Sequence, residues 1–317
     1  MQRAFNQWQF IRRMIAYSPR QLGGEAKARA LIESALRLHR IPSTRHGFRT
    51  AIPKARSAVL MADGKRIPCQ NTGFIGGKIL GKSYLVSSMI PSRFLITHPN
   101  INFNPLCPET ISCSNHYFAP SLAVPRSAMP QLLRAKIVEG KTSVQRTPHR
   151  TANVLVGNQK NPRVICFAHY DSINRGAIDN ASGVAVMMAA IIRRPELLKA
   201  ALFIFSANEE LSYDRPTYWG RGFREFERKF FRQMVQAKKI VAIDSLGYGR
   251  TLVSQHPNLQ YLAFPISNIK LWRKKIYVVC GEFEKLMAIY HSDADDMRGM
   301  DRRYLEDGVR RLTHLIG

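Results

Sequence analysis

Acidic residues are scarce in this chain. Its 317 residues include 22 aspartates and glutamates against 48 lysines and arginines, so the formal net charge is +26. The imbalance is greatest in residues 1–150, which contain 23 basic and 5 acidic residues. Such a positive field can attract nucleic acid, acidic peptides or an anionic membrane surface. The basic residues are scattered, however, with no block of about five or six in a row, so we expect no specific nucleic-acid partner.

Long apolar runs and paired cysteines are also missing. No apolar run approaches the roughly 18 residues that a membrane-spanning helix needs, and the first residues lack the apolar core of a secretory signal. A cytoplasmic setting is therefore the expectation. The five cysteines form no CxxC zinc pair, and Cys166 and Cys280 lie in apolar runs as expected for buried thiols. A disulfide between Cys107 and Cys113 stays open at this point.

Short apolar runs alternate with amphipathic segments from residue 151 onward. The predicted strands are 164–168, 202–206, 240–243 and 277–280, and the predicted helices are 24–38, 181–193, 223–235 and 304–316. Strands that alternate with helices predict a mostly parallel sheet that helices cover on both faces. Ligands of such sheets bind beyond the carboxyl ends of the strands.

Residues 51–145 differ from the rest of the chain in composition and in the pattern of apolar residues. Proline, glycine and serine separate short β-like runs such as SAVLMA, GGKILG and PSLAVP, and the segment closes with a short helix, AMPQLLRAKI. We therefore predict an inserted β-rich module at 51–145, while residues 1–50 and 146–317 together form the main domain. No oligomeric state is indicated by the sequence.

Residues suited to metal binding follow the predicted strands. They are His169 and Asp171 after the first strand, Glu209 and Glu210 after the second, Asp244 after the third, and His291 beyond the fourth. Imidazole and carboxylate groups are zinc ligands. Asp179 lies just before a helix whose N-terminal amides favour negative charge, and its two oxygens suit a bridge between two metals. The pattern predicts a metal site that supports hydrolysis.

Two further roles follow from spacing. Glu209 and Glu210 are neighbours, so their side chains point in different directions, and one can bind metal while the other takes a proton from water. Asp171, two residues after His169, is expected to hold the other imidazole nitrogen, and Asp295 to do the same for His291.

These motifs resemble the co-catalytic di-zinc aminopeptidase family, whose relatives include glutamate carboxypeptidases and glutaminyl cyclases. The matching segments are AHYDS, GAIDNASG, SANEE followed by WGRGF, AIDSLG and YHSDADD, with SPRQLGGEAKARALIESAL resembling the opening helix of the family. The segment APSLAVPRSAMPQLLRAKIVEGKTSV resembles the end of the protease-associated domain that is often inserted in this family.

The resemblance implies an α/β fold of zinc-peptidase type, with a mixed, mostly parallel sheet between helices. It also implies two zinc ions per chain and an aminopeptidase activity on peptides, in which a hydroxide between the metals attacks the carbonyl. The implied roles are one zinc on His169 and Asp244, the other on Glu210 and His291, Asp179 as the bridge, and Glu209 as the general base.

Other activities remain open within the same resemblance. A single-zinc acyltransferase of the glutaminyl cyclase type shares the HYDS-like motif, and a carboxypeptidase for acidic C-terminal residues would suit the positive charge. A non-catalytic binding module is less compatible with the sequence, because such relatives lose ligands and none of the implied ones is missing here. The amine-anchoring residue and the preferred N-terminal residue are not indicated.

Overall fold

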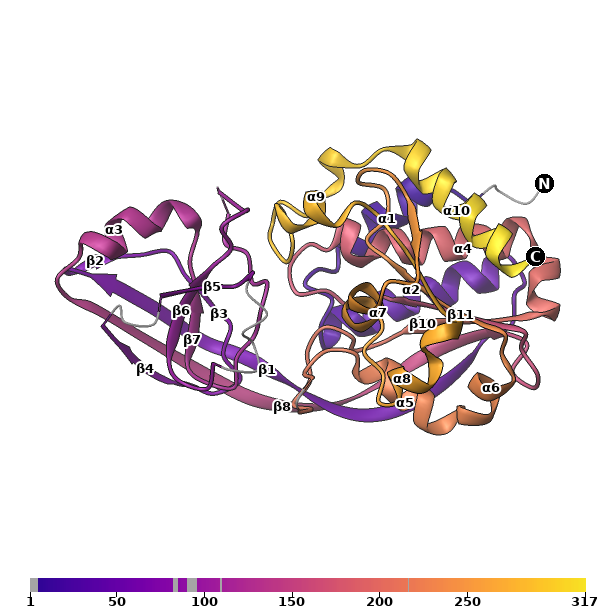
Figure 1. Ribbon diagram of the computed structural model, residues 1–317, viewed down its shortest axis with the longest axis horizontal. Helices are drawn as coiled ribbons and strands as arrows, with labels where there is room; N and C mark the ends of the chain where they lie inside the picture. Colours follow the sequence, from indigo (N-terminus) through magenta and orange to yellow (C-terminus); the bar gives the residue numbers. More distant parts are fainter. Residues whose placement is uncertain (1–4, 82–84, 90–95, 109, 216) are drawn as a thin grey trace.

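Two long strands join a main domain to a smaller β-rich module (Figure 1). The computed structural model describes residues 5–81, 85–89, 96–108, 110–215 and 217–317. β1 (Thr44–Ala62) and β8 (Val138–Gly157) pair antiparallel along nearly their whole length, with one register shift between Ala55 and Ser57. Both strands belong to the large sheet at one end and to the module at the other.

The remaining elements are short. The other strands are β2 (Lys65–Arg66), β3 (Gln70–Asn71), β4 (Gly77–Leu80), β5 (Leu85–Ser87), β6 (Asn100–Phe103), β7 (Ser121–Ala123), β9 (Val164–His169), β10 (Ala201–Ser206), β11 (Lys239–Asp244), β12 (Leu252–Ser254) and β13 (Ile276–Cys280). The α-helices are α1 (Gln7–Ile15), α2 (Gly23–Leu38), α3 (Met129–Arg134), α4 (Gly183–Arg193), α5 (Arg221–Lys229), α6 (Phe231–Gln236), α7 (Pro257–Ala263), α8 (Ile269–Trp272), α9 (Phe283–Met287) and α10 (Arg302–Ile316).

The large sheet is mixed, with a parallel centre. Its strand order is β12-β13-β11-β9-β10-β8-β1-β2, and β4 pairs with β8. The four strands β13, β11, β9 and β10 are parallel, so their carboxyl ends meet at one edge. The predicted α/β class is therefore confirmed.

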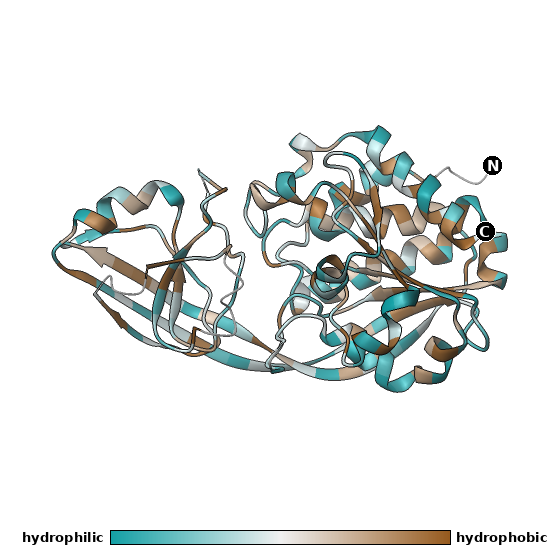
Figure 2. Ribbon diagram, in the orientation of Figure 1, coloured by the Kyte–Doolittle hydropathy of each residue, from teal (hydrophilic) through white to brown (hydrophobic). Residues whose placement is uncertain are grey.

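Helices cover both faces of this sheet, because its central strands are apolar on both sides. In β9, Cys166 and Ala168 face a core formed with α1, α2, α4 and α10, whereas Ile165 and Phe167 face a second core under α5 to α8. α4 is buried along nearly its whole length between the sheet and the outer helices. Figure 2 shows brown, apolar segments concentrated in these inner helices and strands. The apolar packing gives the loops at the strand ends a rigid base.

The β-rich module has a core of its own between the outer part of the large sheet and a second sheet. The second sheet has the order β3-β7-β6-β5, and residues such as Leu60, Leu122 and Val138 pack between the two layers. The predicted module boundaries lie inside β1 and β8, because the β1–β8 ladder continues across them. The division into two domains and the protease-associated resemblance both stay predictions.

The predicted strands and most predicted helices agree with the structure to within a few residues. The single predicted helix at 223–235 is wrong, because the chain breaks at Phe230 into α5 and α6. The Phe226 and Phe230 rings stack 4.7 Å apart across this break, so the apolar spacing continues where the helix does not. Cys107 and Cys113 both have free thiols. None of the described helices combines the length and apolar character needed to cross a membrane.

Candidate metal centre

The carboxyl ends of the parallel strands bring the predicted ligands together. His169 is the last residue of β9 and Asp244 the last of β11, and Glu209 and Glu210 follow the end of β10. The sequence predicted that these residues meet at one edge because each ends or closely follows a buried strand. His291 reaches the same edge by another route, from the loop beyond α9.

Asp179 lies between the two histidines. Its Oδ1 is 3.1 Å from His169 Nε2, while its Oδ2 is 3.4 Å from His291 Nε2. Asp244 Oδ1 approaches the same nitrogen of His169 at 3.8 Å, and Glu210 Oε2 lies 2.8 Å from His291 Nε2. Asp179 thus presents one carboxylate oxygen to each histidine.

These side chains form two groups that could each hold a metal ion. One group is His169, Asp179 and Asp244, and the other is Asp179, Glu210 and His291. Within each group the ligand atoms all lie within 4.8 Å of one another.

The donor atoms fit zinc. Within the part of the chain that the structure describes, His291 Nε2 and Glu210 Oε1 are buried with no hydrogen-bond partner. His291 Nε2 and Glu210 Oε2 are close, but their geometry is not that of a hydrogen bond. Buried polar atoms without partners are costly, and a shared cation relieves that cost. Imidazole nitrogen and carboxylate oxygen are ordinary zinc ligands.

One protein family matches the segment that carries most of the candidate ligands. Residues 151–254 match peptidase family M28. This match covers about a third of the chain and agrees with the family resemblance seen in the sequence motifs. The match spans β9, β10 and β11, which hold or precede all the candidate ligands except His291. No curated protein matches the sequence.

Solved structures share the fold across nearly the whole chain. A zinc aminopeptidase from Bacillus subtilis superposes with a TM-score of 0.72 at 16% identity, covering 99% of this chain and 94% of that chain. A peptidase M28 precursor from Shewanella amazonensis gives 0.69 at 13% identity, covering 99% and 93%. A glutaminyl cyclase from Tannerella forsythia gives 0.52 at 13% identity, covering 99% of each chain. At these identities the likeness is one of fold.

In the metal-free protein, the charged groups of the candidate metal centre strongly influence one another's pKa values. Burial raises the pKa of Glu209 well above its ordinary value, and the neighbouring carboxylates raise it further. Burial also raises the pKa of Glu210 to about 7. For Asp179, burial opposes ionisation, but the adjacent imidazoles of His169 and His291 outweigh that effect and lower the pKa of the carboxyl group. The carboxylates gathered at the site repel one another, and a bound cation would relieve that repulsion.

Asp171 holds the loop that carries the two glutamates. Its carboxylate accepts hydrogen bonds from the backbone N–H groups of Glu209 and Glu210, at 3.0 and 2.9 Å. Asp171 Oδ1 also faces His169 Nδ1 at 3.5 Å, so the expected pairing is an ion contact without hydrogen-bond geometry. Asp171 therefore links the end of β9 to the loop after β10.

The prediction that Asp295 holds His291 is wrong. The Asp295 carboxylate instead accepts from the backbone N–H groups of Ile178 and Asp179, at 2.7 and 3.1 Å. His291 Nδ1 faces the backbone oxygen of Cys113 at 3.1 Å. Spacing along the chain favoured the nearby aspartate, whereas the tertiary fold brings a segment of the β-rich module closer.

Sequence reasoning also missed Arg20. Its side chain is fully buried and donates to the backbone oxygens of Tyr170, Arg175 and Gly176, at 2.7, 2.9 and 2.8 Å. These bonds shape the loop between His169 and Asp179, and burial lowers the arginine pKa to about 10. The one sequence feature that could have identified Arg20 is its position in the SPRQLGG segment, where it is not distinguishable from the other scattered basic residues.

Asn180 is a second missed residue. Its side-chain nitrogen donates to Ile243 O at 2.8 Å, and its oxygen accepts from Ser245 N at 3.2 Å and Gly183 N at 3.1 Å. The bonds to Ile243 and Ser245 flank Asp244 on both sides. Asn180 therefore ties the position of Asp244 to that of the neighbouring Asp179.

A pocket of about 490 Å³ opens beside the centre. Glu209 lines it together with all five candidate ligands. Apolar groups such as Leu259, Phe283 and Met287 form much of the wall. Ser88, Met89, Ser114 and Asn115 of the β-rich module also line the pocket. The pocket offers an apolar side chain a place next to the polar centre.

Proposed function

We propose that this protein is a zinc-dependent aminopeptidase with two zinc ions per chain. The observation that supports this most is the position of Asp179, whose two carboxylate oxygens face two separate sets of ligand atoms. In this assignment His169 and Asp244 bind one ion, and Glu210 and His291 bind the other. Zinc at these positions would polarise the scissile carbonyl and lower the pKa of an attacking water.

Glu209 is the proposed general base. It belongs to neither ligand group, yet it lines the pocket beside both. Its backbone N–H donates to Asp171, which holds the backbone of Glu209 in place beside the pocket. A carboxylate with a raised pKa can take a proton from water and return it to the leaving amine. Asp171, which the spacing predicted to hold the imidazole of His169, acts in this scheme by positioning the two glutamates.

The proposed substrates are peptides with a free N-terminus. The N-terminal side chain would lie in the pocket against the apolar wall formed by residues such as Leu259 and Met287. That wall favours an apolar first residue, because burying apolar area is worth roughly 25 cal/mol per Å². The rest of the bound peptide would extend out of the open side of the pocket.

The test combines metal analysis with a substrate panel. Two equivalents of zinc, together with chelator-sensitive release of N-terminal residues from aminoacyl-nitroanilides, are the expected result. A protein that binds no zinc and releases no residue would refute the proposal.

Glutaminyl cyclisation is the second candidate, since the fold of the Tannerella forsythia cyclase covers 99% of this chain. One zinc equivalent and cyclisation of an N-terminal glutamine would establish it. Release of acidic C-terminal residues would point instead to a carboxypeptidase.

A further inference from the structure

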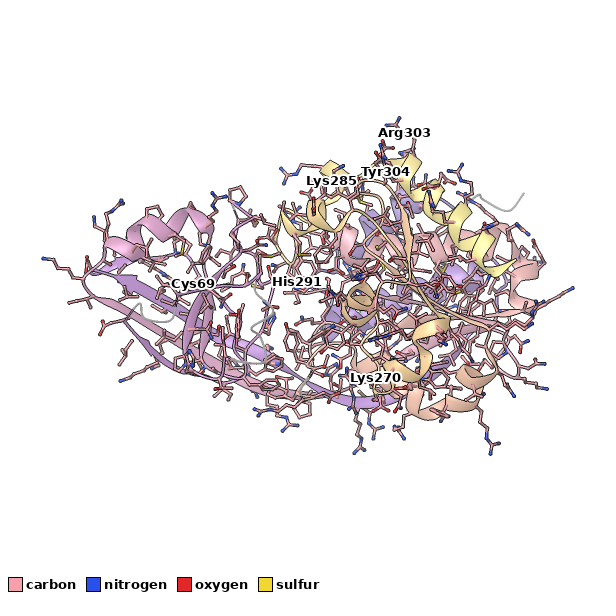
Figure 3. All side chains as sticks on the ribbon, in the orientation of Figure 1. Cys69, Lys270, Lys285, His291, Arg303 and Tyr304 are labelled. Carbon is pink, nitrogen blue, oxygen red and sulfur yellow. The ribbon has the colours of Figure 1, made fainter. Side chains whose placement is uncertain are left out.

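His291 lies against the β-rich module as well as in the metal centre. Figure 3 labels it on the side of the main domain that faces the module. Cys113 of the module donates its backbone N–H to His291 O at 2.9 Å, and Cys113 O lies 3.1 Å from His291 Nδ1. Asn174 of the main domain adds a bond to His291 O at 2.6 Å. The module thus contacts both the backbone and the ring of a candidate ligand.

The contact with Cys113 sets the orientation of the imidazole ring. A carbonyl oxygen only accepts hydrogen bonds, so His291 Nδ1 must carry the proton. In the neutral ring this leaves the lone pair on Nε2, which faces Asp179 and Glu210. Such partners of a metal-bound histidine commonly change metal affinity by about 10- to 100-fold.

The backbone of His291 needs this support. Its φ is +49°, in the left-handed region that residues other than glycine rarely adopt. A residue held there depends on the surrounding contacts to stay in place. Contacts from the module are therefore part of what determines where the ligand lies.

Asn104 joins the module to the segment that ends in His291. It is buried, and its side-chain nitrogen donates to Met287 O at 2.8 Å, to Ser112 Oγ at 3.0 Å and to Ser114 Oγ at 3.2 Å. Ser112 Oγ in turn donates to Tyr290 O at 2.5 Å, directly before the histidine. One amide thus fixes two module serines and the chain that carries the ligand.

We propose that Asn104 is a positioning residue for His291, and that the β-rich module is thereby part of the metal centre. The proposal rests on the proposed function in taking His291 as a zinc ligand. It requires that loss of Asn104 weaken the ion held by Glu210 and His291. The ion held by His169 and Asp244 should be unaffected, because none of the contacts described for Asn104 reaches those residues.

The chain contains a matched control. Asn102, two residues away, is equally buried and donates to Thr72 Oγ1, Asn100 Oδ1 and Ser121 Oγ, at 2.9, 3.2 and 2.9 Å. Its fourth bond, to Leu122 O, also stays within the module. Substitution of Asn102 therefore tests general damage to the module without touching the segment that carries His291.

The experiment compares Asn104→Ala and Asn102→Ala in the full chain. Zinc affinities are measured by competition with a chromogenic chelator, and cobalt absorption spectra report the ligand environment. For Asn104→Ala we expect one of the two affinities to fall about 10- to 100-fold, with a changed cobalt spectrum. Asn102→Ala should keep both affinities even if its melting temperature falls. Equal affinities in Asn104→Ala and wild type, or an equal loss in both variants, would overturn the proposal.

Amide hydrogen exchange separates this proposal from the proposed function, because it needs no metal. In metal-free Asn104→Ala the amide of Cys113 should exchange faster, whereas in Asn102→Ala it should not. If the wild-type protein bound no zinc, the metal assignment would be refuted. The exchange pattern would still show whether Asn104 holds the Cys113 segment against His291. Ser112→Ala, which deletes the bond to Tyr290 O, provides a milder variant if Asn104→Ala fails to fold, and the same selective loss is expected.

Discussion

Substitution of Glu209 by glutamine separates base catalysis from metal binding. The side chain is 6% exposed, lines the pocket and belongs to neither group of candidate ligands. Glutamine has nearly the same shape and keeps the backbone bond to Asp171, but it cannot accept a proton from water. Loss of a general base typically costs about 10²- to 10⁴-fold in kcat, or roughly 3–5 kcal/mol of transition-state stabilisation.

The same substitution should not weaken the fold. Burial and the neighbouring carboxylates raise the pKa of Glu209, so its ionised form is disfavoured in the metal-free protein. A neutral amide removes that repulsion, and we expect the melting temperature of metal-free Glu209→Gln to equal or exceed that of wild type. The exposed Glu196, which pairs with Arg194, offers a control substitution of the same kind with no expected effect on kcat.

The assay is kcat and KM on an aminoacyl-nitroanilide, with zinc content determined on the same preparation. The expected result is a large fall in kcat at unchanged zinc content. A variant with nearly full activity would show that another group accepts the proton. A variant that lost zinc in proportion to its activity would show instead that Glu209 is a ligand.

Three further predictions follow from the surroundings of the centre. Burial raises the pKa of Glu210 and of Asp295 to about 7, above their unfolded values, so the metal-free fold binds these protons more tightly than the unfolded chain does. The contribution of these two groups to stability should fall by roughly 1 kcal/mol per group between about pH 6 and pH 8, because the folded protein loses protons there that the unfolded chain has already released. Melting curves with added zinc should not show this fall, because metal displaces the protons. Arg20→Met should destabilise the protein by about 3 kcal/mol and lower its zinc affinity, because three backbone oxygens lose a buried donor. A variant with an unchanged denaturant midpoint and unchanged zinc content would contradict this prediction. Gly176→Ala should reduce zinc content, because at φ +59° a methyl group would lie 2.3 Å from Asp179 O; a variant with two tightly bound zinc ions would show that the loop can adjust.

Local sequence patterns predicted the part of the fold that depends on local chemistry. A buried parallel strand needs a short apolar run, and the runs that became β9, β10, β11 and β13 were visible for that reason. The carboxyl ends of parallel strands lie at one edge of a sheet. The sequence therefore predicts that His169, the two glutamates and Asp244 lie close together. The break between α5 and α6 was not visible, because apolar spacing continues through it.

The sequence by itself determined which residue types are available for a metal and on which strand ends they lie. Only the tertiary structure decided their partners. Asp295 is close to His291 along the chain, yet it caps the loop before Asp179, while a module segment far away in sequence binds the histidine. The physical reason is that hydrogen bonds form between groups that the packed core brings into contact. The order of the strands predicts most of the candidate ligands. The long β1–β8 pair and the two hydrophobic cores determine which backbone groups lie beside them.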